Sequence, residues 1–247
     1  MSDILLEANH LQKQYPGVNA VNDLHFQVHA GEVVGLLGAN GAGKTTSLRM
    51  LAGILTPSHG YAEVCGTNPV DDPLSARQNI GFLSGDTALY RRMSPREILQ
   101  YFGRLHDMSD YEIKEQSEQL IQRLGMKSFA DRYCSTLSSG QVQRANIART
   151  LIHNPSVLIL DEPTNTLDII TGQFILDAIR EAKQDNRAIL FSTHYMAEAE
   201  ALCDRIVILH EGEVCATGTL DELKDQTSLE KLADIFLHFA GKEEISS

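Results

Sequence analysis

Short apolar runs alternate with longer amphipathic segments along most of this 247-residue chain. Polar or turn-forming residues bound each apolar run, a pattern typical of strands that are buried on both faces. The runs lie at 32–38, 79–84, 157–162, 188–193 and 205–210. Helical spacing follows or separates them at 141–153, 171–184 and 195–203. This alternation predicts an α/β fold whose mostly parallel sheet is covered by helices.

The beginning of the chain departs from this alternation. Residues 4–8 and 24–28 predict short strands separated by a turn at Pro16–Gly17, and residues 61–66 predict another short strand. We expect these strands to form an antiparallel β lobe beside the parallel sheet. Near the other end, residues 211–218 have the pattern of a hairpin.

A polar-rich helical stretch interrupts the α/β pattern. Ser94 is placed to cap a helix, Pro95 suits its first position, and Gly125 suits the end of a second helix at about 109–124. We interpret residues 86–140, approximately, as a helical lobe inserted into a domain that covers 1–220. The remaining tail, 221–247, predicts short helices.

A glycine-rich loop lies between the first buried strand and a helical pattern at 44–55. It reads GANGAGKTT and has the spacing G-x-x-x-x-G-K-[ST], in which the backbone curls so that its N–H groups face phosphate oxygens. Its candidate nucleotide-binding residues are Gly38, Ala39, Asn40, Gly41, Ala42, Gly43, Lys44, Thr45 and Thr46. Lys44 is placed to reach the β- and γ-phosphates, and the Thr45 hydroxyl to hold Mg²⁺. The loop predicts a bound nucleoside triphosphate.

Acidic residues and a histidine follow two other predicted strands. Asp161 ends the run VLILD and can hold Mg²⁺ through water, and Glu162 can act as the base for an attacking water. His194 follows the run at 188–193 and can hydrogen-bond the γ-phosphate. Because ligands bind beyond the carboxyl ends of parallel strands, we expect these side chains to converge with Lys44. The alternatives are a polar strand end for the acidic pair and a structural role for the histidine.

A second anion-binding sequence occurs at 137–141, LSSGQ, where a turn opens a helix. One triphosphate does not need two cradles in one chain. Ser138 and Gly140 therefore predict contact with the nucleotide of a second chain, in a head-to-tail pair that sandwiches ATP. The alternative is that Ser138 or Ser139 only caps the helix.

Composition narrows the classes of partner. The net charge of −12 argues against a surface for non-specific nucleic-acid binding, and we expect no nucleic-acid partner. Arg91–Arg92 is the best short basic patch, unless it is only a solvated pair of charges. The cysteines form no C-x-x-C pair or metal-ligand spacing, which indicates reduced thiols: Cys65, Cys134, Cys203 and Cys215.

These motifs, in this order, resemble those of ABC-type ATPase domains over nearly the whole chain. GANGAGKT resembles the Walker A loop, VLILDEP the Walker B strand, LSSGQ the signature motif, and TNTLD at 164–168 the D-loop, while His194 matches the switch histidine. The resemblance implies a P-loop NTPase (RecA-like) core, ATP hydrolysis with Mg²⁺, and Tyr15 as the aromatic that stacks on adenine. Otherwise Tyr15 is a core or turn tyrosine.

Departures from the family pattern affect three loops. Ser139 stands where the signature motif has glycine, and Thr166 where the D-loop often has glycine or alanine. The glutamine expected after the run at 79–84 is missing, with Gly85 in its place. Asp86 is the nearest carboxylate that could substitute as a Mg²⁺ ligand, unless it only shapes a turn.

The family resemblance also implies partners and a location. Residues 193–205 and the tail are similar to ATP subunits of bacterial sodium- and drug-exporting transporters. The sequence contains no signal-peptide pattern and no apolar run near the roughly 18–20 residues of a membrane span. We therefore expect a cytoplasmic ATPase, peripheral at the inner face of the cell membrane, that drives separate transmembrane permease subunits as a homodimer or a heterodimer with a paralogue. The alternative is a soluble ABC ATPase that moves no solute, for example in iron–sulfur assembly.

Overall fold

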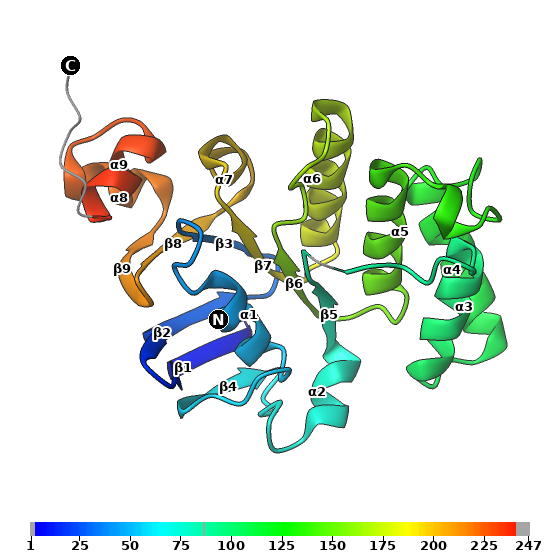
Figure 1. Cartoon of the computed structure of the whole chain (residues 1–247), viewed down its shortest axis with the longest axis horizontal. Helices are drawn as coiled ribbons and strands as arrows, with labels where there is room; N and C mark the ends of the chain where they lie inside the picture. Colours follow the sequence, from blue (N-terminus) through cyan, green and yellow to red (C-terminus); the bar gives the residue numbers. More distant parts are fainter. Residues whose placement is uncertain (1–2, 86, 241–247) are drawn as a thin grey trace.

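The computed structural model describes residues 3–85 and 87–240, which form an α/β fold around one mixed sheet (Figure 1). The strands are β1 Ile4–Tyr15, β2 Val18–His29, β3 Val33–Leu37, β4 His59–Val64, β5 Ile80–Leu83, β6 Val157–Asp161, β7 Ala188–Thr193, β8 Arg205–His210 and β9 Glu213–Gly218. The helices are α1 Lys44–Leu51, α2 Pro73–Asn79, α3 Pro95–Leu105, α4 Asp110–Arg123, α5 Ser139–Leu151, α6 Ile169–Gln184, α7 Met196–Leu202, α8 Leu220–Thr227 and α9 Leu232–Phe239.

The sheet order is β4-β1-β2-β9-β8-β3-β7-β6-β5, and its second half is the predicted parallel core. β3, β6 and β7 are buried along their whole length, so their apolar runs face helices on both sides. β7 lies between β3 and β6, and its register pairs Leu37 with Thr193 and Asp161 with Ser192. The carboxyl ends of these three strands therefore lie at one edge of the sheet.

The predicted antiparallel lobe is also present, with longer strands than the apolar pattern indicated. β1 and β2 form a hairpin of two 12-residue strands that meets at the predicted Pro16–Gly17 turn, and β4 pairs with β1. The apolar pattern does not extend to the turn because the residues beside it are exposed to solvent. Tyr15 is 44% exposed and Val18 is 59% exposed.

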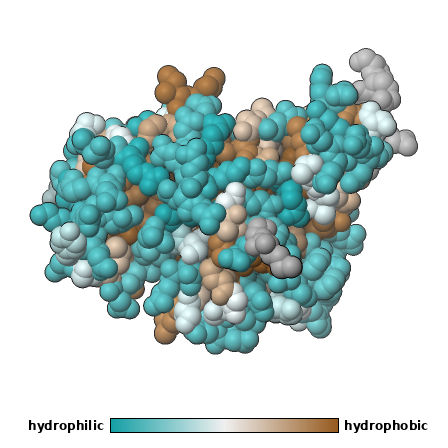
Figure 2. Space-filling model, turned by 180° about the vertical axis from the view of Figure 1, so that it is seen from behind, coloured by the Kyte–Doolittle hydropathy of each residue, from teal (hydrophilic) through white to brown (hydrophobic). Residues whose placement is uncertain are grey.

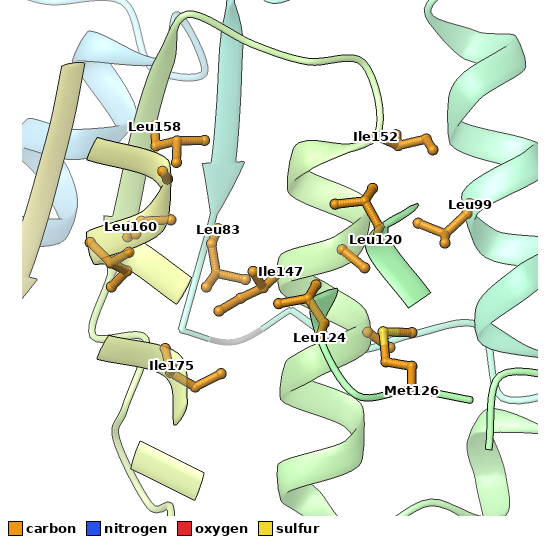
Figure 3. Close-up of a cluster of buried hydrophobic side chains, with 14 of the residues drawn as sticks. Leu83, Leu99, Leu120, Leu124, Met126, Ile147, Ile152, Leu158, Leu160 and Ile175 are labelled. Atoms are coloured by element: carbon orange, nitrogen blue, oxygen red, sulfur yellow. The ribbon is translucent and has the colours of Figure 1, made fainter. Parts of the chain in front are cut away.

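Helices α3, α4 and α5 gather at one end of the sheet, on the right of Figure 1. Ser94 caps α3 in a capping box with Glu97, as predicted, and Gly125 ends α4 at φ +60°. Figure 3 shows Ile147 of α5 between Leu83, at the end of β5, and Leu124, at the end of α4, within one buried apolar cluster. Such burial, at about 25 cal/mol per Å² of apolar surface, fixes the helices against the sheet.

The four cysteine thiols are free, and burial raises the pKa of each, for Cys203 to about 12. Cys203 ends α7 and packs directly on β3, because a Cβ built on Gly35 would lie 2.6 Å from its Sγ. Among the described residues, no helix is long and apolar enough to cross a membrane. Figure 2 shows a largely polar face on which apolar groups are scattered in separate patches.

Candidate functional site

The glycine loop connects β3 to α1, as predicted, and its shape depends on close backbone approach. Gly43 has φ +103°, and a Cβ there would lie 2.4 Å from the backbone oxygen of Ala20, so only glycine fits. Lys44 is 5% exposed and donates to the carbonyl oxygens of Gly38 and Ala39 at 2.8 and 3.3 Å. The lysine ammonium is thus held over the loop, beside the α1 N-terminus, where phosphate binding is favourable.

Thr45, in the first turn of α1, and Asp161, at the end of β6, meet at the carboxyl edge of the sheet. The Thr45 hydroxyl donates to Asp161 Oδ2 at 2.8 Å, and the Ser192 hydroxyl donates to Asp161 Oδ1 at 2.7 Å. Hydroxyl and carboxylate oxygens are the hard donors that Mg²⁺ prefers, and both lie beside the glycine loop. The pair fits a magnesium ion, which Thr45 and Asp161 would hold beside a bound nucleotide.

Glu162 has an unusual backbone conformation for a non-glycine residue, with φ +46°. Its N–H donates to both the carbonyl and the hydroxyl oxygen of Ser192, at 3.2 and 3.0 Å. Its side chain accepts from Asn165 Nδ2 at 3.1 Å and lies 3.3 Å from Lys44 Nζ. β7 therefore holds Glu162 so that its carboxylate faces the lysine of the glycine loop.

His194 follows β7 and lies next to the same carboxylate. Its Nδ1 is 3.3 Å from Glu162 Oε1, but this atom makes no hydrogen bond because the contact lacks hydrogen-bond geometry. The imidazole packs at 4.1 Å against the ring of Tyr195. The predicted convergence of Lys44, Asp161, Glu162 and His194 is thus present in the structure.

The LSSGQ turn and Tyr15 lie outside this set of contacts. Ser138 caps α5, with its hydroxyl accepting from the Gln141 N–H at 3.3 Å, which is the helix-capping alternative. Gly140 packs on α6, where a Cβ would lie 2.8 Å from Thr171 Cγ2. Tyr15 contacts Lys13 Nζ at 5.3 Å from the ring centroid. Within 3–85 and 87–240, no hydrogen bond or ion pair joins Ser138 or Tyr15 to the Lys44 cluster, so their predicted contacts with ATP stay predictions.

The loop that lacks the family's glutamine passes next to the site. A Cβ on Gly85 would lie 3.5 Å from the Asp161 carbonyl oxygen. The carbonyl of Thr87 accepts from Asn146 Nδ2 of α5 at 3.1 Å, which fixes the loop to this helix. Asp86, the proposed substitute ligand, lies outside the described residues.

Sequence reasoning missed contacts that arrange the site. Ser192 was identified only as part of a strand end, but it links Asp161 to the Glu162 backbone. Glu198 on α7 was not identified, although it accepts hydrogen bonds from Thr164 and Thr193. Asp168, matched to the D-loop acidic position, caps α6, and hydrogen bonds from Thr171 lower its pKa. Only the serine had a detectable signal, its position beside Thr193 and His194.

The described residues could form two other kinds of site, a metal-binding cluster or a pocket apart from the Lys44 cluster. Within the described residues, no cluster of three or more histidine, cysteine, aspartate or glutamate side chains is arranged to bind a metal. A hollow of about 470 Å³ is lined by residues of β2, β8 and β9 and by Glu32, which precedes β3. It shares none of the predicted site residues. Arg205 is already paired there with Glu32 at 3.0 Å.

Comparison with known proteins identifies the family. Residues 21–165 match the ABC transporter family. The chain is 44% identical over 221 residues to the ABC transporter ATP-binding protein NatA of Bacillus subtilis, covering 89% of this chain and 90% of that protein. It is 38% identical over 218 residues to the Nod factor export ATP-binding protein I of Rhizobium johnstonii, covering 88% and 70%.

A solved structure of an ATP-binding subunit of an ABC transporter superposes with a TM-score of 0.88 at 30% identity, over 95% of this chain and 99% of that one. The family match and the relatives aligned over most of the chain lead to the same conclusion as the converging residues. This chain belongs to the ABC transporter family and is an ATP-hydrolysing, ATP-binding member of it.

Proposed function

We propose that this chain hydrolyses Mg²⁺–ATP as one half of a nucleotide-sandwiched dimer and that hydrolysis drives export through separate transmembrane permease subunits. The observation that carries the proposal is the meeting of Lys44, Asp161 and Glu162 at one sheet edge, with 3.3 Å between Lys44 Nζ and Glu162 Oε1. These groups supply phosphate binding, metal binding and a base, which are the parts that phosphoryl transfer to water requires.

In this proposal each residue has a distinct role. The 38–46 backbone and Lys44 bind the phosphates, and Thr45 with Asp161 holds Mg²⁺, supported by their 2.8 Å contact. When bound, Mg²⁺ neutralises developing charge on the β- and γ-phosphate oxygens. Glu162 accepts a proton from the attacking water, and His194 orients toward the γ-phosphate. Tyr15 stacks on adenine from the exposed end of the hairpin.

The export role follows from the character of the relatives. A Nod factor export protein and NatA align over most of this chain, and these relatives do not favour the alternative function, a non-transport ABC ATPase. Because none of the described helices can cross a membrane, transport needs partner subunits, and the chain would act at the inner face of the cell membrane. We propose that the permease subunits dock on the helical lobe at about 86–140, which we interpret as an insertion in a domain that covers 1–220, with 221–247 as a tail.

The role of Glu162 is tested by Glu162→Gln, with Glu200→Gln of α7 as the matched control. The amide keeps the size of the side chain but cannot accept the proton, so turnover should fall by roughly 10²–10⁴ while ATP affinity is retained. Turnover is measured as phosphate release and affinity by equilibrium nucleotide binding. Near-normal hydrolysis by Glu162→Gln would remove the residue from this role.

The dimer is tested by mixing two inactive chains, one carrying Lys44→Ala and the other Ser138→Arg. A mixed dimer has one site with both motifs intact and one with neither, so part of the ATPase activity should return. The mixture is compared with each variant alone, and mixed dimers are confirmed by co-purification of two differently tagged chains. If confirmed mixed dimers stay as inactive as either variant, the composite site is wrong.

A further inference from the structure

One carboxylate that was given no role above joins two connections of the site, the turn after β6 and the end of β7. Glu198 lies in the first turn of α7. Its Oε2 accepts from the Thr164 hydroxyl at 2.9 Å and from the Thr193 hydroxyl at 2.9 Å. The two threonines belong to different strand ends, so a single oxygen atom bridges them.

The bridge is part-buried, and both of its donor residues are buried. Thr164 is 5% exposed and Thr193 is 1% exposed, so neither hydroxyl can exchange its partner for bulk water. The Thr193 hydroxyl also accepts from the Tyr195 N–H at 3.0 Å, which leaves its proton for Glu198. Both threonines must therefore donate, and the acceptor must offer two lone pairs at one place, as a carboxylate oxygen does.

The bridged residues are immediate neighbours of the proposed catalytic groups. Thr164 follows Glu162 by two positions, across Pro163, and Thr193 directly precedes His194. Glu162 has a left-handed backbone, which persists only where surrounding contacts fix it. Ser192 fixes the Glu162 N–H, and the Glu198 bridge fixes the chain on its other side.

We propose that Glu198 is a positioning residue for ATP hydrolysis. It keeps the loop that begins at Glu162 and the turn that carries His194 at a constant separation, so that both side chains meet the γ-phosphate together. The inference rests on the roles proposed for Glu162 and His194. Within residues 3–85 and 87–240, no hydrogen bond or ion pair joins the Glu198 side chain to Lys44, Glu162 or His194, and we give it no part in phosphate or metal binding.

The decisive comparison is between Glu198→Ala and Glu198→Gln. Alanine removes the acceptor of both hydroxyls, whereas the glutamine amide oxygen can still accept two hydrogen bonds. We expect Glu198→Ala to lower kcat at least tenfold and toward about 10²-fold, as small misplacements of reacting groups do. Glu198→Gln should restore most of the loss. The control is Glu200→Ala, which removes the same charge from the same helix, where that carboxylate accepts from the Leu232 N–H.

If Glu198 had only a structural role, its variants would change ATP binding or stability together with kcat. Each variant is therefore measured for kcat per nucleotide-binding chain, for the Kd of ATP, and for its thermal unfolding midpoint, with kcat assayed well below that midpoint. A positioning residue changes kcat and leaves the Kd within about twofold of wild type, because ground-state binding is untouched. A Kd weakened by the same factor as kcat is reduced would overturn the inference, as would an unchanged kcat in Glu198→Ala.

A second variant tests one arm of the bridge. Thr164→Val keeps the volume of the side chain and removes only the Thr164–Glu198 bond, and we expect it to lower kcat in the same direction. Combined with Glu198→Ala it should add little, because the bond is already lost. Fully additive losses would show that the two residues act separately. Normal kcat in Glu198→Ala beside an inactive Glu162→Gln refutes this inference alone, whereas an active Glu162→Gln refutes the proposed function beneath it.

Discussion

The substitution Ser192→Ala gives a quantitative test of how β7 organises the site. Ser192 is fully buried, and its hydroxyl donates to Asp161 Oδ1 at 2.7 Å while accepting from the Glu162 N–H at 3.0 Å. A hydrogen bond to a charged group contributes about 1.5–3 kcal/mol. Loss of the bond from the Glu162 N–H costs less free energy, because this N–H still donates to the Ser192 carbonyl oxygen at 3.2 Å in the variant. We therefore expect a loss of about 2–3 kcal/mol in the free energy of unfolding.

The assay compares thermal unfolding and urea titration of wild type, Ser192→Ala and the control Thr150→Val. Thr150 is also buried, but its hydroxyl donates to the neutral carbonyl of Asn146 within α5 at 2.9 Å, so its loss should cost about 1 kcal/mol or less. For a chain of this size, Ser192→Ala should lower the midpoint by roughly 5–10 °C. Equal losses in the two variants would show that the Asp161 carboxylate does not depend on this hydroxyl.

Three further results are expected. Gly85→Gln should lower the Mg²⁺ concentration for half-maximal ATPase activity several-fold, because the glutamine side chain adds a hard oxygen ligand. Its Cβ would make an ordinary 3.5 Å contact with the Asp161 carbonyl oxygen, so the substitution fits. An unshifted Mg²⁺ titration would contradict this expectation. Burial lowers the pKa of His153 from 6.5 to about 4, so the unfolded chain binds an extra proton between these values, and up to about 3 kcal/mol of stability present above pH 6.5 is lost as the pH falls to 4. His153→Gln should flatten that slope in urea titrations at several pH values, and parallel slopes would refute the assignment. Tyr15→Ala should raise the Kd of ATP about five- to tenfold, as loss of one aromatic stack costs about 1–1.5 kcal/mol, whereas Tyr15→Phe should bind like wild type; equal affinities would exclude stacking.

Most of the fold was predictable because its signals are local. The fully buried strands β3, β6 and β7 are apolar runs between polar residues. Helix α3 begins at a capping box whose residues, Ser94 and Glu97, are recognisable in the sequence. Helix α2 was missed although Asp72 and Pro73 mark its start, because it has seven residues and buries only Ala76. A helix that packs a single side chain on the core leaves no periodicity to detect.

The site was predictable in its residues but not in its connections. Lys44, Asp161 and His194 could be brought together from sequence because carboxyl ends of parallel strands meet at one edge. The contact of Glu198 with Thr164 joins residues 34 positions apart through side chains alone, and no spacing rule predicts such a pair. Ser138 shows the opposite limit: its capping role follows from local sequence, whereas its proposed contact with ATP depends on a second chain.

The packing of Cys203 on β3 gives this protein a natural reporter of its own opening. A thiol whose pKa is raised to about 12 holds almost no thiolate at neutral pH, and the thiolate is the form that attacks disulfide reagents. Its Sγ fills the space beside Gly35, in the strand that feeds the phosphate loop, so any adduct would displace that strand. Labelling of Cys203, followed separately from labelling of the other three free thiols, should therefore be fastest when the strand and helix separate. Its rate in the presence and absence of ATP measures, without any engineered probe, how strongly the nucleotide holds the sheet closed.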